Sequence, residues 1–143
     1  MSVKLLRRGG SCMKHHSESA SWLAKAQDDL RWTESNLREE VYYGACFTAQ
    51  QAVEKALKAY LISQGKILRK VHTLDAILEE CIAFDASFES IREIILPLVD
   101  YYIQTRYPDV SEFIDYTKEK AEDAYVRASE ALAFINQKLA VSS

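Results

Sequence analysis

Apolar side chains recur at intervals of three and four residues along most of this chain, the spacing that places them on one face of an α-helix. The first two stripes predict a helix over residues 19–40 and another from residue 42 to near Gly65, because glycine commonly follows the last turn of a helix. These stripes consist of Leu23, Ala26, Leu30, Thr33 and Leu37, and of Tyr42, Cys46, Ala49, Val53, Ala56 and Tyr60.

The rest of the chain continues this periodicity. A short stripe over Leu74–Cys81 predicts a third helix, and the stripe over Phe88–Tyr102 predicts a fourth helix that Pro97 kinks or tightens. The longest stripe, over Ile114–Ile135, predicts a fifth helix. Asp109 stands three residues before a glutamate and gives that helix a start that resembles a capping box.

Four long helices and one short helix with brief connections predict an all-α fold, an antiparallel up-and-down bundle. We expect this bundle to span residues 19–143. Residues 1–18 show no periodicity and contain two adjacent glycines, so we expect them to form a flexible leader. The alanines at positions 45, 49, 52, 56 and 59 share one face of the second predicted helix, which favours close packing in the core.

Composition agrees with a single helical domain. The 143 residues include only 4 glycines and 2 prolines, too few for the many tight turns of an all-β protein. The 18 basic and 21 acidic residues give a net charge of -3, which argues against a protein held on duplex DNA by bulk charge. Residues 1–72 have an excess of basic residues and residues 73–143 an excess of acidic ones. The halves could pair within a monomer or across a dimer, or the charge could form an uneven, solvated surface.

Cysteine and histidine do not form a metal-binding pattern. Cys12, Cys46 and Cys81 lack the spacing of a zinc site or a disulfide framework, and the pair His15-His16 has no third ligand at helical spacing. We therefore expect no metal, no cofactor and a cytoplasmic location. The longest uncharged run, Val41–Val53, is too short to cross a bilayer, so we expect no membrane association.

A basic cluster is the first candidate phosphate-binding site. No acidic residue occurs between positions 55 and 70, and five cations within sixteen positions can hold a phosphate. In the alternative interpretation these residues form a solubilising loop. The cluster consists of Lys55, Lys58, Lys66, Arg69 and Lys70.

Arg106 is the second candidate, because it stands just before the predicted start of the fifth helix. The free amides of a helix N-terminus and a guanidinium together favour an anion. Alternatively, Asp109 caps this helix and Arg106 pairs with a nearby acid. For His72, which precedes the third predicted helix, a capping role or a bond to a core carbonyl is favoured over a catalytic role.

Three segments resemble the HEPN family (higher eukaryote and prokaryote nucleotide-binding). Residues 47–59, FTAQQAVEKALKA, resemble its QQA-EK-LKA helix, and His72-Thr73-Leu74 resembles its H-[DT]-L segment. Arg106-Tyr107-Pro108-Asp109 resembles its RYPD segment. The three occur in the family's order, and the resemblance covers about residues 19–139. It implies a helical bundle, usually a symmetric homodimer, often encoded beside a minimal nucleotidyltransferase in prokaryotes.

Many HEPN proteins are metal-independent RNases with an R-x4-6-H motif, in which the arginine stabilises phosphate charge and the histidine moves protons. Counted from Arg106, the histidine positions are Ser111, Glu112 and Phe113, and no histidine follows His72. The resemblance therefore implies a non-catalytic role here. Its candidate nucleotide contacts are Arg106, Lys58, Lys66, Arg69 and Lys70.

Some related toxins are silenced when the transferase adenylylates a tyrosine shortly after the arginine motif, and Tyr116 stands in roughly that region. We expect a nucleotide- or RNA-binding partner of a minimal nucleotidyltransferase, in a toxin–antitoxin-like module. One alternative is a ribonuclease toxin that uses Glu112 or Asp109 as a replacement base. The other is a helical adaptor without a ligand.

Overall fold

The computed structural model describes residues 2–66, 68, 73–101 and 115–142, and within these ranges the side chains from His16 to Val141. No strand occurs among them, so the predicted all-α bundle is confirmed. The helices are α1 (Ser2–Arg38), α2 (Tyr42–Ser63), α3 (Leu74–Phe84), the 3₁₀ helix η1 (Ala86–Ile91), α4 (Arg92–Val99) and α6 (Lys118–Ser142).

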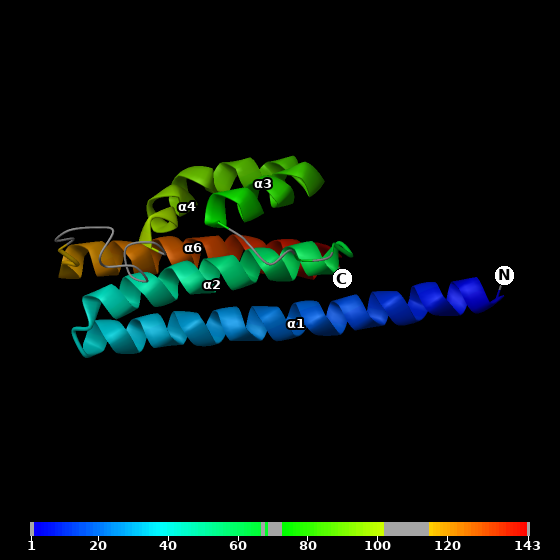
Figure 1. Ribbon diagram of the computed structural model, residues 1–143, viewed down its shortest axis with the longest axis horizontal. Coiled ribbons are helices and arrows are strands. Elements are labelled where there is room, and N and C mark those ends of the chain that lie inside the picture. Colours follow the sequence, from blue (N-terminus) through cyan, green and yellow to red (C-terminus); the bar gives the residue numbers. More distant parts are fainter. Residues whose placement is uncertain (1, 67, 69–72, 102–114, 143) are drawn as a thin grey trace.

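Helix α2 occupies the centre of the bundle. It runs antiparallel to α1, α6 lies along it, and α3 and α4 cover the side opposite α1 (Figure 1). Small side chains make this central position possible, because they let neighbouring backbones approach. The five alanines predicted to pack in the core are all fully buried, which confirms their role: Ala45, Ala49, Ala52, Ala56 and Ala59.

The C-terminus of α2 has the geometry that its glycine predicted. Gly65 adopts a φ of 80°, a left-handed conformation that costs glycine little. Its N–H donates to the carbonyl of Ile62 at 2.9 Å, and the N–H of Lys66 donates to the carbonyl of Leu61 at 3.0 Å. These two bonds form a Schellman motif, which satisfies the last carbonyls of the helix and turns the chain toward α3.

Three helix boundaries differ from the sequence pattern. α1 begins at Ser2 rather than near residue 19, and the domain boundary after residue 18 stays a prediction. The fourth predicted helix consists of η1 and α4, because Asp85 accepts a hydrogen bond from the Ser87 amide at 3.0 Å and starts a separate 3₁₀ turn. α6 begins at Lys118, and the predicted start near Asp109 lies outside the described residues.

Pro97 lies inside α4 and removes the N–H that would otherwise bond to the carbonyl of Glu93, four residues earlier. Arg127 of α6 supplies the missing donor. Its Nη1 lies 3.0 Å from the Glu93 oxygen and 3.2 Å from the Ile94 oxygen. The guanidinium thus ties α4 to α6 at the place where the proline weakens the helix.

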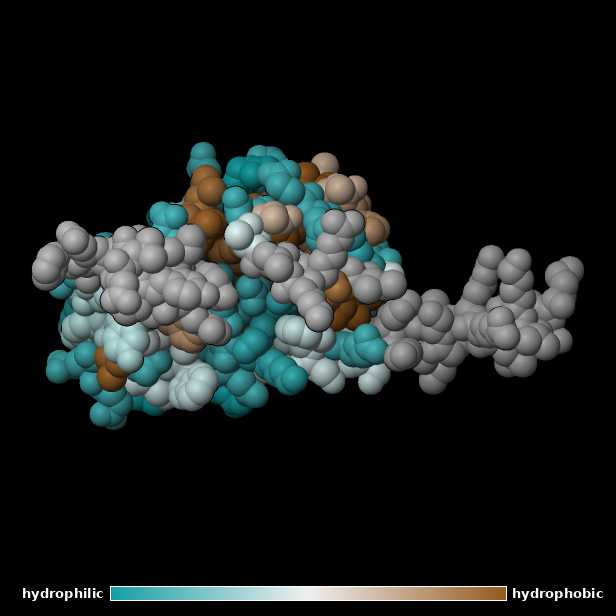
Figure 2. Space-filling view, viewed as in Figure 1, coloured by the Kyte–Doolittle hydropathy of each residue, from teal (hydrophilic) through white to brown (hydrophobic). Residues whose placement is uncertain are grey.

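The surface of this bundle is polar over the long helices. On the face drawn in Figure 2, hydrophilic residues predominate along α1 and α2, and hydrophobic residues gather in small separate patches over α3 and α4. No helix in the described ranges combines the length and the apolar character that a bilayer crossing requires.

Candidate functional site

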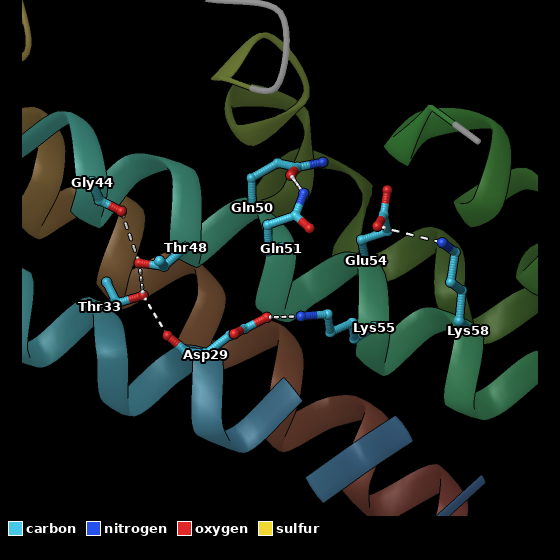
Figure 3. Close-up of polar contacts among 9 residues, drawn as sticks. All are labelled: Asp29, Thr33, Gly44, Thr48, Gln50, Gln51, Glu54, Lys55 and Lys58. Carbon is cyan, nitrogen blue, oxygen red and sulfur yellow. Dashed lines mark hydrogen bonds and ion pairs between the residues drawn. The ribbon is translucent and has the colours of Figure 1, made fainter. Parts of the chain in front are cut away.

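Two lysines of the basic cluster project from α2 and are held by carboxylates. Lys55 Nζ lies 2.5 Å from Asp29 Oδ2 of α1, and Lys58 Nζ lies 3.4 Å from Glu54 Oε2, one turn earlier on α2 (Figure 3). Only about a tenth of each carboxylate side chain is exposed, 10% for Asp29 and 12% for Glu54. These lysines therefore neutralise poorly solvated carboxylates, and Lys55 also joins α2 to α1.

Trp22 of α1 contacts the same region. Lys58 Nζ lies 5.5 Å from the centroid of its ring, and Lys25 Nζ lies 5.9 Å from it, both within the range of cation–π attraction. Lys58 keeps only 14% of its side chain exposed. Of the candidate phosphate contacts, Lys58 is thus already engaged by Glu54 and Trp22.

Lys66 begins the connection between α2 and α3 and is more accessible. Its Nζ lies 3.2 Å from Glu80 Oε1 and 5.8 Å from the centroid of the Phe84 ring, with 30% of the side chain exposed. Both partners belong to α3, so Lys66 fixes the start of the connection to that helix. The candidates that follow it, Arg69, Lys70 and His72, lie outside the described residues.

The arginine motif also lies outside the described residues, with Arg106, Tyr107 and Asp109 among the positions concerned. The residues on either side of this segment are described. The rings of Tyr101 and Tyr116 lie 6.4 Å apart, centroid to centroid. The two ends of the segment between them therefore meet at one place, where α2, α4 and α6 come together.

The phenols and the thiol at this junction are neutral at ordinary pH. Burial raises the pKa of Tyr101 to about 12 and that of Cys46 to about 11. Burial, and to a smaller extent the Cys46 thiol, also raises the pKa of Tyr116. The Tyr116 hydroxyl is buried and has no hydrogen-bond partner in the described part of the chain. A modifying enzyme would therefore reach this hydroxyl only after the atoms that bury it moved aside.

Lys58 and the junction formed by Tyr101, Tyr116 and Cys46 (the tyrosine junction) lie toward opposite ends of α2. Cys46, whose thiol lies close to Tyr116, is near the start of the helix, and Lys58 is twelve residues further on. A rise of about 1.5 Å per residue separates these positions by about 18 Å along the helix axis. Lys66 lies beyond that, after the helix ends. One phosphate therefore does not bridge Lys58 or Lys66 and the tyrosine junction within one chain.

Sequence patterns missed the polar contacts between α1 and α2. Thr33, predicted as part of an apolar stripe, lies 2.8 Å from Thr48 through their hydroxyls, and it donates to the carbonyl of Asp29 at 3.0 Å (Figure 3). Thr48 in turn lies 2.9 Å from the carbonyl of Gly44. A threonine at an apolar position is the only local signal, and its partner is known only once the helices pack. No group of three metal-ligating side chains occurs in the described ranges.

Comparison with known families gives a match that covers most of the chain. The model of the HEPN domain matches residues 19–138. Among curated proteins, one named "Putative toxin MJ1304", from Methanocaldococcus jannaschii, is 28% identical over 127 residues. The alignment covers 80% of this chain and 83% of that protein.

Two solved structures have the same arrangement of helices. TT1696 from Thermus thermophilus is 34% identical with a TM-score of 0.72, over 84% of this chain and 97% of that one. ST0689, described as an archaeal HEPN homologue, is 27% identical with a TM-score of 0.68, over 85% of this chain and 97% of that one.

Proposed function

This chain belongs to the HEPN family, and from that premise we propose that it is a non-catalytic, nucleotide- or RNA-binding partner of a minimal nucleotidyltransferase. The pair would form a toxin–antitoxin-like module. The similarity to MJ1304, a protein whose name includes the word toxin, supports such a module. The phosphates of the ligand would contact Arg106 together with Lys66, Arg69 and Lys70.

This proposal rests on the residues at positions 111, 112 and 113, where the RNase motif counted from Arg106 would place its histidine. When the 2′-hydroxyl of RNA attacks the adjacent phosphate and cleaves the strand, one group must take the proton of that hydroxyl and another must give a proton to the leaving oxygen. The side chains of Ser111 and Phe113 carry no group that exchanges protons near neutral pH, and the ordinary pKa of a glutamate, the residue at position 112, is about 4.3. An arginine remains to hold the phosphate, so binding survives where proton transfer does not.

The separation along α2 favours RNA over a mononucleotide as the ligand. Lys66, just after the end of α2, and the tyrosine junction, near its start, lie toward opposite ends of this helix. A single nucleotide cannot contact groups more than about 18 Å apart, whereas a short RNA strand places several phosphates over such a distance. We therefore propose that a strand of several nucleotides binds more tightly than any mononucleotide.

Binding measured by fluorescence anisotropy with a labelled single-stranded RNA, and with labelled ATP and GTP, tests this proposal. The double variant Arg69→Ala/Lys70→Ala should bind the RNA at least about tenfold more weakly, since each charge-assisted phosphate contact contributes about 1.5–3 kcal/mol and about 1.4 kcal/mol is one decade. Affinity should also fall as salt rises.

The matched control is Arg31→Ala, which removes a cation whose side chain is 78% exposed and lies on α1, outside the candidate set. Equal binding by the double variant and this control, with unchanged melting, would mean that the cluster is a solubilising surface. Separately, co-expression with a minimal nucleotidyltransferase encoded nearby should yield a complex that survives gel filtration. A transferase that elutes alone would contradict the partner role.

A further inference from the structure

Three tyrosine rings form a row that begins at the protein surface. Tyr43, near the start of α2, packs its ring 6.5 Å from Tyr116 at an interplanar angle of 60°, and Tyr116 packs 6.4 Å from Tyr101 at 56°. Exposure falls along the row, because 57% of Tyr43 but only 7% of Tyr101 is exposed. The exposed ring is therefore supported from behind by two rings that the fold already holds.

The row lies where the two ends of the arginine-bearing segment meet, since Tyr101 and Tyr116 flank that segment. A cation is close by. Lys120 lies in the first turn of α6, four residues after Tyr116, and its backbone N–H donates to Thr117 Oγ1 at 3.1 Å. Lys120 is exposed and makes no ion pair with any residue that the structure describes. No described carboxylate therefore holds its ammonium, unlike those of Lys55 and Lys58.

We propose that Tyr43 is a stacking platform for one base of single-stranded RNA, and that Lys120 contacts a phosphate next to that base. This deepens the proposed RNA binding and rests on it. A supported aromatic ring with a cation nearby is the arrangement that recognises single strands, because every base offers a flat face whatever its sequence. A ring already held by its neighbours loses little conformational freedom when the base stacks.

A protein partner would use the same ring differently. It would need a broad apolar patch around Tyr43, but the nearest exposed apolar side chain in sequence, Val41, is only 37% exposed and follows two glutamates. A single exposed ring, with a cation on the neighbouring helix α6, matches a base and its phosphate better than it matches an apolar surface.

The test uses the full chain and a single-stranded RNA in which 2-aminopurine replaces some adenines, because stacking on an aromatic ring quenches the fluorescence of this base. The wild-type protein should bind the RNA and quench it. Tyr43→Ala should weaken binding by roughly five- to 150-fold and abolish the quenching. Tyr43→Phe should keep both within about twofold, since the ring and not the hydroxyl stacks.

Trp32→Ala is the matched control, because it removes another exposed aromatic ring, 64% exposed, that is not part of the row. Equal losses of RNA affinity in Tyr43→Ala and Trp32→Ala, or quenching that persists in Tyr43→Ala, would overturn this inference. Neither result would contradict the proposed RNA binding. A wild-type protein that binds no RNA would overturn the proposed function as well. Dissociation of a dimer by Tyr43→Ala but not by Tyr43→Phe would overturn the inference too, and would assign the ring to an interface between chains.

Discussion

At the scale of single residues, the charged side chains of this protein divide into those that hold helices together and those that make no ion pair with any residue that the structure describes. Lys55 belongs to the first kind, because it joins α2 to Asp29 of α1, and Lys58 stays bound between Glu54 and Trp22. Lys120 belongs to the second kind. The family motif around positions 54–58 therefore has a structural explanation in the pairing of its charges.

The Lys55–Asp29 pair should contribute measurably to stability. Only 10% of the aspartate side chain is exposed, so its charge depends on the lysine more than that of a surface residue would. In a double-mutant cycle with Lys55→Met and Asp29→Asn, urea unfolding should give a coupling free energy of about 1 kcal/mol. The exposed pair Arg31–Asp28 is the control and should give a smaller value. Equal coupling in both pairs would contradict this role.

Asp85 should make stability depend on acid pH. Hydrogen bonds from the Ser87 hydroxyl, the Lys138 ammonium and the Ser87 amide lower the pKa of Asp85 from 3.8 to about 2. Because the folded state lowers this pKa, the stability it contributes is fully present above about pH 4 and is lost as the pH falls toward about 2.

Asp85→Asn removes this dependence and measures it. The variant should unfold at lower urea than the wild type at neutral pH, and the difference should shrink between about pH 4 and about pH 2. A difference that stays constant over that range would show that Asp85 acts as a helix cap without its charge.

At the scale of secondary-structure elements, α4 is stabilised by a residue from another helix. Pro97 leaves the Glu93 carbonyl without its helical donor, and Arg127 of α6 donates to it at 3.0 Å. This contact keeps a short helix of eight residues in register with α6.

Arg127→Met should lower the free energy of unfolding by about 1 kcal/mol, because a hydrogen bond to an accessible carbonyl is lost. In a Pro97→Ala background the same change should cost less, since alanine restores the backbone N–H that can bond to the Glu93 carbonyl. Chemical unfolding of the four proteins measures both values. The same loss in both backgrounds would mean that the pairing of Arg127 with Asp123, and not the carbonyl contact, explains the effect.

Features that depend on a single helix could be predicted from the sequence. Features that depend on contacts between helices could not. The stripe of alanines and Gly65 at the end of α2 follow from periodicity and φ preference, which act within one helix. The division of the fourth predicted helix into η1 and α4 depends on Asp85, whose carboxylate also forms an ion pair with Lys138 of α6. The engagement of Lys58 could not be predicted either, because Trp22 reaches it from another helix.

At the scale of the whole molecule, the basic excess of the first half lies outside the described side chains of α1 and α2. Among the described side chains of α1 and α2, acidic residues balance basic ones, so the proposed attraction for RNA would come from the chain's other cations. The basic residues of the first half that lie outside these side chains are Lys4, Arg7, Arg8, Lys14, Lys66, Arg69 and Lys70.

We expect the protein to form a homodimer. Opposite charge balances in its two halves and the usual assembly of its family both favour association of two chains. Sedimentation equilibrium at micromolar concentration should give about twice the chain mass of 16.3 kDa. A mass of one chain over the whole concentration range would contradict this prediction.

The most direct test asks whether the purified protein holds RNA without cutting it. A labelled single-stranded RNA is incubated with excess protein at neutral pH, binding is measured by anisotropy, and strand length is then read on a denaturing gel. We expect bound RNA of unchanged length, because no histidine follows Arg106 at the motif spacing. Cleavage by the wild-type protein that Arg106→Ala abolishes, in a variant that keeps the wild-type helical content, would contradict the non-catalytic role.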